Sequence, residues 1–524
     1  MRMTNKIMQN NSLYNINNNK VLQDKLSTQM STQKKLTRPS DDPVIAIRAL
    51  RLRSNVSELT QYYEKNAPDA ESWLEVTGKG LNTVTEVLTD MSKQANKAAN
   101  KDLTADDLAI IVEQMKSLRD EFYSTGNLDY AGRYVFTGYR TNTTMSFTKA
   151  EIEETKPEYV ITEQNTMADF DKLNYTYIDE LEGMNASNYD TKNVTEQEVV
   201  NGDIHRMRLA YDDLDTTAGV TIQVMQKDKT TEDSQITATT VSSSHDPDPY
   251  KMIQDANLSD PKENKVIFVP ETGELLFSDA AYEDLNNQTS GIDGSDTEIR
   301  VSYTKKNWQV GDLRPEHYFA CEGTTMQDGT PKKIEYNQEY LQNKKEQQVI
   351  EYDVGYNQKI QVNTTADEVF SHRLTRDVDD LENALKELTA IEATRSDLDN
   401  LRKNMEEGTP EYNEVQLKYE AADKAYNYIR QKMHGLFEST ISSTQGYLDD
   451  TNVAITDNGT RLSRLDLISN RLMDQQTTFK TLQSTNEDAD IADVAVKLTS
   501  TELTYNAALM ATGKIMQTSL MNYI

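Results

Sequence analysis

The sequence contains few hydrophobic residues, which build a compact core, and almost no cysteine, which forms disulfides. Its 524 residues include one cysteine, Cys321, so no disulfide can form within the chain, and its YFACEG setting predicts a small buried hydrophobic residue. Only 36% of the residues are hydrophobic and two are tryptophan. This composition argues against one compact core and favours long helices that expose one face.

Long apolar runs are also missing. No stretch of 18 apolar residues occurs, and the segment after Met1 has no apolar region typical of a cleaved secretory signal. We therefore expect no membrane insertion, and export only through a machine that needs no cleaved signal.

Basic residues are outnumbered by acidic ones: 55 Lys and Arg against 86 Asp and Glu give a formal net charge of −31. Nucleic acid and anionic membranes would repel such a chain, so we expect neither as a partner. Residues 1–53 are the exception, with a net charge of +7. This asymmetry indicates either that the N-terminal segment meets an acidic surface of its own kind or that it is a solvated helix face.

Catalytic patterns are absent as well. We find no HExxH, P-loop, GxSxG, complete GxGxxG or CxxC pattern, and the acidic turns lack the alternating ligands of an EF-hand. The five histidines share no ligand spacing. They are His205, His245, His317, His372 and His434. The sequence thus predicts no catalytic residue, no cofactor and no metal site.

Apolar residues recur every seven positions after Pro43, as in a heptad repeat. A second series, one position later in the repeat, then takes over, which is the drift that a straight helix shows against a strict heptad. The two series are Ala49, Val56, Tyr63, Ala70, Thr77, Val84, Met91 and Ala98, and later Leu74, Leu81, Leu88 and Ala95. We expect Pro68 to kink or restart this helix near Asn66. A second helix is predicted from Ala105 to Tyr123.

The middle of the chain has a different period. The run AGRYVFTGYRT, Ala131 to Thr141, predicts a strand of a β-hairpin. Short alternating stretches over residues 149–365 predict a β-rich insert of one or two small domains, with a hairpin turn at Pro270 to Gly273. Helical periodicity then returns, with a turn at GTPEY and two separate helices through Tyr419 to Ile429 and Ile455 to Leu482.

The two ends of the chain carry apolar stripes that we predict to be an assembly interface. Its candidate residues are Ile7, Tyr14, Val21, Leu22 and Leu26 at one end, and Ile491, Ala495, Leu498, Tyr505, Leu509, Met516, Leu520 and Tyr523 at the other. Seven asparagines lie from Asn5 to Asn19. Since asparagine is a poor helix former, this arm should fold only when packed. Alternatively, both helices dock on the chain's own core.

A helix-start block separates this arm from the helix beyond it. Pro39 keeps the preceding residue extended, Ser40, Asp41 and Asp42 offer cap oxygens and negative charge, and Pro43 suits the first helical turn. The predicted fold class is therefore mainly α with a β-rich insert. Its N- and C-terminal segments form a long helical coiled coil or bundle around central β domains.

Four segments carry a resemblance to a known family. MRMTNKIMQNNSLYNINNN, STQKKLTRPSDDPVIAIRALRLR, AGRYVFTGYRT and IADVAVKLTSTELTYNAALMATGKIMQTSLMNYI resemble the flagellin superfamily, and GRYVFTGYRT favours its junction proteins. DNGTRLSRLDLISNRL fits the same family. The resemblance covers residues 1–145 and 450–524. It implies terminal coiled-coil segments at 1–40 and 486–524, disordered in the monomer, a helical rod at 41–148 and 366–485, and an outer insert at 149–365.

The same resemblance implies a structural adaptor between the hook and the filament of the bacterial flagellum, without enzymatic activity. The implied partners are further copies of this chain in a ring, the neighbouring hook-associated junction protein, flagellin and a cytoplasmic export chaperone. The implied location is the extracellular flagellum, reached through the flagellar type III export apparatus without a cleaved signal peptide.

Two other functions stay open. The chain could be flagellin itself, the filament subunit, because the terminal pattern is shared and the long middle suits it. The insert could instead make it a surface-adhesive flagellar protein that binds a carbohydrate or a host. A hydrolase grafted on a flagellar stem lacks a catalytic constellation.

Overall fold

A computed structural model describes residues 5–521 except 37, 101–102, 179, 192–193, 226–231, 260–262, 291–297, 328–329 and 343–347. The chain divides into two compact units, each described here by itself. Unit 1 comprises residues 1–71, 352–360 and 463–524, and unit 2 comprises residues 72–351 and 361–462.

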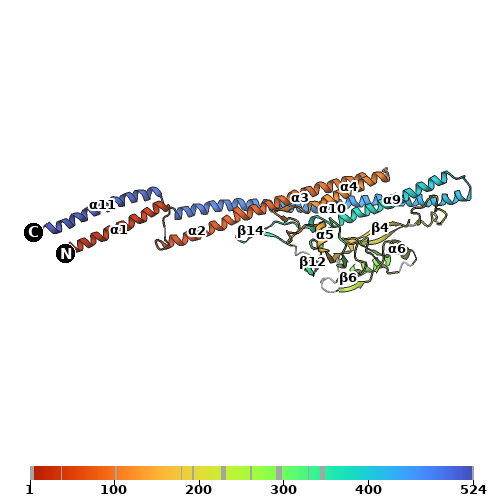
Figure 1. Cartoon of the computed structure of the whole chain (residues 1–524), viewed down its shortest axis with the longest axis horizontal. Helices are drawn as coiled ribbons and strands as arrows, with labels where there is room; N and C mark the ends of the chain where they lie inside the picture. Colours follow the sequence, from red (N-terminus) through yellow and green to blue (C-terminus); the bar gives the residue numbers. More distant parts are fainter. Residues whose placement is uncertain are drawn as a thin grey trace. The chain divides into compact units, whose positions relative to one another are not determined.

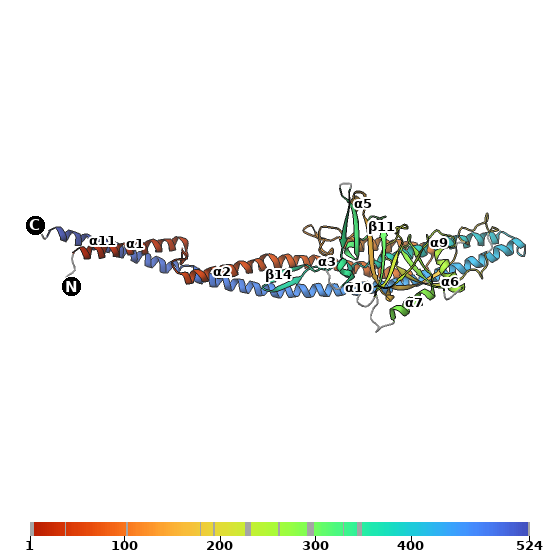
Figure 2. The ribbon, with the colours of Figure 1, turned by 90° about the horizontal axis from the view of Figure 1, so that it is seen from below.

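Unit 1 is built from helices and one hairpin. Its helical elements are α1 (Asn5–Thr32), α2 (Pro43–Gln61), the π-helical turn η1 (Tyr62–Asn66), the start of α3 (Ala67–Ala98), the end of α10 (Pro410–Glu487) and α11 (Ile491–Met521). Helices α1 and α11 lie side by side (Figures 1 and 2). The hairpin of β14 (Glu351–Gly355) and β15 (Gln358–Gln361) is fixed by a hydrogen bond of 2.7 Å from Asn66 Nδ2 to the Asp353 carbonyl.

The helix does not restart at Pro68, because a π-helical turn precedes the proline. The Ala67 N–H bonds to the Tyr62 carbonyl, five residues back. A proline ring in an ordinary α-helix clashes with the carbonyl four residues earlier, and the wider π turn relieves this. The expected restart is therefore replaced by a local change of helix type.

Unit 2 contains a helical core built on the apolar residues that recur every seven positions after Pro43. The residues Trp73, Leu74, Thr77, Leu81, Val84, Leu88, Met91, Ala95 and Ala98 of α3 are all buried. Further helices are α4 (Ala105–Thr125), α8 (Ala366–Val369) and α9 (Arg373–Lys403), joined by the rest of α10. The separate helices expected over residues 419–482 are wrong, since α10 is one helix of 78 residues. Its isolated glycines, each worth about 1 kcal/mol against alanine, do not end it because packing overrides propensity.

The AGRYVFTGYRT run holds a much shorter strand than expected. Strands β1 (Asp129–Tyr130) and β2 (Arg133–Tyr134) pair around Ala131 and Gly132, which both have positive φ, at 52° and 77°. The chain then turns inward, and the Phe136 ring packs edge-to-face on Phe370 at 5.0 Å. Core packing thus ends the pairing after two residues.

The insert is rich in β-structure, as predicted, and forms two sheets. One has the order β4-β5-β10-β9-β8 and the other β13-β12-β3-β11-β6-β7. The strands are β3 (Glu158–Asn165), β4 (Phe170–Thr176), β5 (Asn201–Arg208), β6 (Thr221–Met225), β7 (Glu232–Ile236), β8 (Thr239–Thr240), β9 (Val266–Val269), β10 (Glu274–Phe277), β11 (Ile299–Lys305), β12 (Ala320–Gln327) and β13 (Thr330–Tyr336). Three helices were not predicted: α5 (Lys149–Thr155), α6 (Pro249–Ser259) and α7 (Asp279–Ser290).

Two details of the insert agree with the sequence. Strands β9 and β10 pair across the expected turn, where Gly273 has φ +62° and a Cβ would lie 1.9 Å from the Tyr211 carbonyl oxygen. Only glycine fits there. Cys321 is buried in β12, as its setting predicted.

A buried ion cluster attaches the five-stranded sheet to α9 within unit 2. Arg206 of β5, of which only 4% of the side chain is exposed, binds Glu274 at 2.8 Å, Asp380 at 2.7 Å and Asp171 at 2.8 Å. Burial alone would raise the pKa of Asp380, but Arg206 and Arg208 outweigh it and lower that pKa to about 2.

Candidate assembly interface

Helices α1 and α11 meet along a seam of which half the residues are polar. The seam consists of half-buried and buried residues at spacings of three and four. They are Gln9, Ser12, Ile16, Asn19, Gln23 and Leu26 of α1, and Val494, Leu498, Thr501, Tyr505, Ala508 and Thr512 of α11. Gln23 Nε2 donates to Glu502 Oε1 at 3.4 Å. Such a seam buries little apolar surface, so it stabilises the isolated helix pair weakly.

Most predicted residues of the N-terminal stripe lie outside this seam. Leu26 is buried in it, but Ile7 and Leu22 are exposed, and Tyr14 and Val21 have exposed fractions of 67% and 70%. The reason is the position of the stripe around the helix: the seam repeats every seven residues through Gln9, Ile16 and Gln23, and the stripe lies two residues earlier, which places it about 200° away on the helix surface. The stripe is therefore left uncovered within the described part of the chain.

The C-terminal stripe divides between the seam and the surface. Leu498 and Tyr505 lie in the seam and Ala495 is half-buried beside it, while Ile491 and Leu509 are exposed. Met516 and Leu520 belong to α11, but their side chains lie outside the described part, as does all of Tyr523. Their role in assembly stays a prediction.

The helix-start block places one residue as the cap of α2. Asp42 Oδ1 accepts hydrogen bonds from the backbone N–H groups of Val44 at 3.0 Å and Ile45 at 3.1 Å, and Pro43 occupies the first turn. Asp41 instead closes the preceding turn, since its carboxylate accepts from the Arg38 N–H at 3.3 Å. Pro39 and Ser40 are exposed in this turn. Of the three predicted cap residues, Asp42 is the one that accepts hydrogen bonds from the first turn of α2, and its negative charge lies at the positive, N-terminal end of the helix dipole.

A set of charged residues, here called the clasp, joins the turn after α1 to the end of α10. It consists of Lys34, Lys35, Arg53, Glu487 and Asp488. Arg53 binds the buried Glu487 carboxylate through two hydrogen bonds, of 2.8 and 2.5 Å, and Lys34 pairs with Asp488. The Lys35 N–H donates to the Glu487 carbonyl at 2.7 Å.

The cations of the clasp neutralise two acidic residues at the C-terminal end of α10. Glu487 and Asp488 are acidic residues at the negative end of the helix dipole, which is unfavourable unless cations are near. Hydrogen bonding to Lys34 and Ser484 lowers the pKa of Asp488, and hydrogen bonding to Glu487 raises the pKa of Arg53. The sequence analysis missed these pairs, although the excess of basic residues over 1–53 was the signal that could have indicated them.

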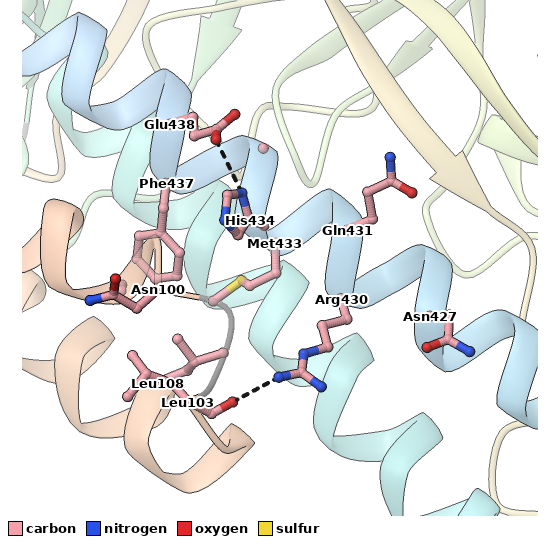
Figure 3. A pocket seen from close by; sticks show the side chains of 12 residues that line it. Asn100, Leu103, Leu108, Asn427, Arg430, Gln431, Met433, His434, Phe437 and Glu438 are labelled. Carbon is pink, nitrogen blue, oxygen red and sulfur yellow. Dashed lines mark hydrogen bonds and ion pairs between the residues drawn. The ribbon is translucent and has the colours of Figure 1, made fainter.

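A groove of about 730 Å³ in unit 2 lies where the turn between α3 and α4 meets α10 (Figure 3). Leu103, Leu108 and Phe437 are among its lining residues, and Arg430 donates to the Leu103 carbonyl at 3.3 Å. His434 pairs with Glu438 at 3.3 Å, one helical turn away. No serine, threonine or cysteine is among the described residues that line this groove.

No group of three or more His, Cys, Asp or Glu side chains that could hold a metal occurs in the described part of the chain. Every helix searched there is too short or too polar to cross a lipid bilayer. Burial lowers the pKa of His317 to about 4, and its Nε2 contacts the Thr144 carbonyl at 3.1 Å. This histidine is therefore neutral at pH 7 and has a packing role.

Comparison with known proteins connects these helices to the flagellum. Residues 3–141 match the model of the bacterial flagellin N-terminal helical region. The chain is 30% identical over 161 residues to "Flagellar hook-associated protein 3" of Escherichia coli (strain K12), covering 30% of this chain and 49% of that protein. It is 31% identical over 142 residues to the protein of the same name from Salmonella typhimurium (strain LT2), covering 27% and 44%. The chain thus spans about half the length of the curated relatives it matches.

Among solved structures, FlgL of Xanthomonas campestris aligns with 82% of this chain and 98% of its own, at 12% identity and a TM-score of 0.30. At that score the two chains do not superpose as a whole, so the relationship rests on the sequence matches. The resemblance of this chain to flagellar hook-associated protein 3, expected from its terminal motifs, is confirmed by these sequence matches and by the match of residues 3–141 to the flagellin N-terminal helical region.

Proposed function

We propose that this protein is a structural adaptor of the bacterial flagellum that joins the hook to the filament and assembles as a ring through its terminal helices. One observation carries the proposal: the helices α1 and α11 leave many of their large apolar side chains exposed. Tyr14 and Val21 on α1 and Leu503 and Met510 on α11 are among the most exposed. A monomer does not benefit from such a surface, whereas further helices packed against it would bury it.

The composition of the seam supports the same conclusion. Half of its residues are polar, the one hydrogen bond found across it in the described part joins Gln23 and Glu502, and α1 begins with an asparagine-rich segment, so the helix pair is weak alone. Apolar burial against neighbouring copies supplies the missing stability, so folding of the arm is coupled to assembly. An arm that stays unfolded until assembly suits export through a narrow channel.

The partners follow from this role. The neighbouring hook-associated junction protein and flagellin would cover the two ends of the ring, and a cytoplasmic export chaperone would cover the C-terminal helix before export. The β-rich insert at 149–365 would face the medium, outside the rod at 41–148 and 366–485. The chain would reach the extracellular flagellum through the flagellar type III apparatus and would have no enzymatic role.

Deletion of the gene in the source bacterium tests the proposal. A junction role predicts bare hooks and abundant unpolymerised flagellin in the medium, because filament subunits are exported but have nothing to grow from. Complete hooks without secreted flagellin would instead make this chain the filament subunit. Normal filaments would contradict both functions in a bacterium with a single copy of the gene.

Complementation of the deletion tests the carrying observation. The variant Tyr14→Glu/Val21→Glu should be exported but fail to restore filaments, since charge on an assembly face opposes burial. Leu258→Glu is the matched control, because Leu258 is equally exposed but lies on α6 of the insert. Equal restoration by both variants would show that the exposed face of α1 is not an assembly surface.

A further inference from the structure

Unit 1 has two exposed helix faces of opposite charge. The α2 face consists of Val44, Ile47, Arg48, Leu50 and Arg51. Val44 and Ile47 are 67% and 55% exposed, and no residue of α2 is fully buried. With spacings of three and four residues, Val44, Ile47, Arg48 and Arg51 share one side of the helix, flanked by Leu50. The face is therefore apolar and cationic.

The α10 face lies near the end of that helix and consists of Asp466, Leu467, Asn470, Met473 and Asp474. Leu467 is 73% exposed, and Met473 is also exposed. The spacing again places these residues on one side, opposite to the buried Leu465, Ile468, Leu472 and Gln476. This face is apolar and anionic.

The charged side chains of both faces lack ion partners within the described part of the protein. None of the ion pairs found there involves Arg48, Arg51, Asp466 or Asp474, although the neighbouring Arg53 and Gln476 do contact other parts of unit 1. Four charged and five apolar side chains thus remain available on the two faces.

The two faces match in size and cannot meet in one copy. From Val44 to Arg51 the α2 face extends about 10 Å, and from Asp466 to Asp474 the α10 face extends about 12 Å. Within unit 1, α2 and α10 contact each other through their opposite sides, where Gln476 Nε2 donates to Thr60 Oγ1 at 3.0 Å. The two exposed faces therefore point away from each other.

We propose that the α2 face of one copy docks on the α10 face of the next copy, with Arg48 and Arg51 against Asp466 and Asp474. Such a contact joins two different surfaces, so each copy uses one face on each side, and a rotation that closes generates a ring. Apolar residues at the centre would be buried while the charges fix register and exclude like-charged pairings. The inference rests on the proposed assembly but concerns a different surface from the α1–α11 arm.

Charge reversal of each face provides the test, with the purified full-length chain at low ionic strength. Copies carrying Arg48→Glu/Arg51→Glu should self-associate at least about tenfold more weakly, because acidic faces then oppose each other. Copies carrying Asp466→Arg/Asp474→Arg should fail in the same way. A one-to-one mixture should recover association, since every contact between unlike variants pairs opposite charges. Sedimentation velocity measures all three samples.

The mixture also shows whether weaker association comes from loss of the contact or from misfolding, because two misfolded variants would not restore each other's association. Lys79→Glu, at an exposed position of α3, is the control and should associate like the wild type. A second readout uses Ile47→Cys in one copy and Leu467→Cys in another, which should form a disulfide between copies under oxidising conditions. The buried Cys321 should not react.

Two outcomes would overturn the inference. If the wild type associates but charge reversal changes nothing, or the mixture stays dissociated, this contact is wrong and the proposed ring stands on the terminal arm alone. If the wild type does not associate under any condition, both the contact and the proposed self-assembly are contradicted.

Discussion

Replacing Arg53 by alanine should open the clasp between the turn after α1 and the end of α10. The guanidinium makes two hydrogen bonds to a carboxylate that is almost fully buried, and its own side chain is about half exposed. Hydrogen bonds to charged groups contribute about 1.5–3 kcal/mol, and solvent screening places this pair near the lower end. Lys34, 3.9 Å from Glu487, compensates part of the loss. We therefore expect a local destabilisation of about 1–2 kcal/mol.

Amide hydrogen exchange measures this locally. The Lys35 N–H bonds to the Glu487 carbonyl and the Ala489 N–H to the Gln33 carbonyl, so both amides report opening of the clasp. A loss of 1–2 kcal/mol corresponds to exchange that is about 5- to 30-fold faster. Arg48→Ala is the control, because Arg48 lies on the same helix outside the clasp. Unchanged exchange at both amides in the Arg53 variant would refute the reasoning.

Three further predictions concern other parts of the chain. Arg206→Met should destabilise unit 2 by about 3–5 kcal/mol, visible as a lower midpoint in urea with the β-sheet signal as readout, because it leaves the buried Glu274 without a cation and Arg208 as the remaining partner of Asp171 and Asp380. Burial raises the pKa of Asp379 to about 6, above its unfolded value, so its charge costs stability as pH rises from about 4 through 6. Asp379→Asn should then raise the free energy of unfolding at pH 8 by at most about 3 kcal/mol and leave it unchanged near pH 4; the same increase at both pH values would contradict this. Asp42→Ala should speed exchange of the Val44 amide about fivefold through loss of the cap, and an unaltered rate would show that the cap is dispensable.

Long periodic segments could be predicted from the sequence because burial follows helix period directly. The seven-residue repeat through Leu74, Leu81 and Leu88 identified the core of α3, and Asp42 with Pro43 marked the start of α2. The alternation over 149–365 identified the sheets. In these segments local propensity and packing agree.

Pairings set by three-dimensional packing could not be predicted. Strand β2 ends at Tyr134 because Phe136 packs in the core against Phe370. Nothing in AGRYVFTGYRT indicates at which residue the strand gives way to this packing. The clasp joins residues more than 430 positions apart, and the charge asymmetry alone left open whether the basic N-terminal segment meets an acidic surface or is solvated. The stripe through Tyr14 and Val21 is exposed and does not face α11, and its role in assembly stays a prediction.

The most direct test of the central claim is where the protein sits on the intact flagellum. Immunogold electron microscopy of cells that carry an epitope at Gly183, a left-handed glycine in a turn of the insert with no neighbouring atom within 4 Å of a Cβ, would locate it. A junction adaptor predicts label in one band where the hook meets the filament. Label along the whole filament would contradict the account and identify the chain as the filament subunit.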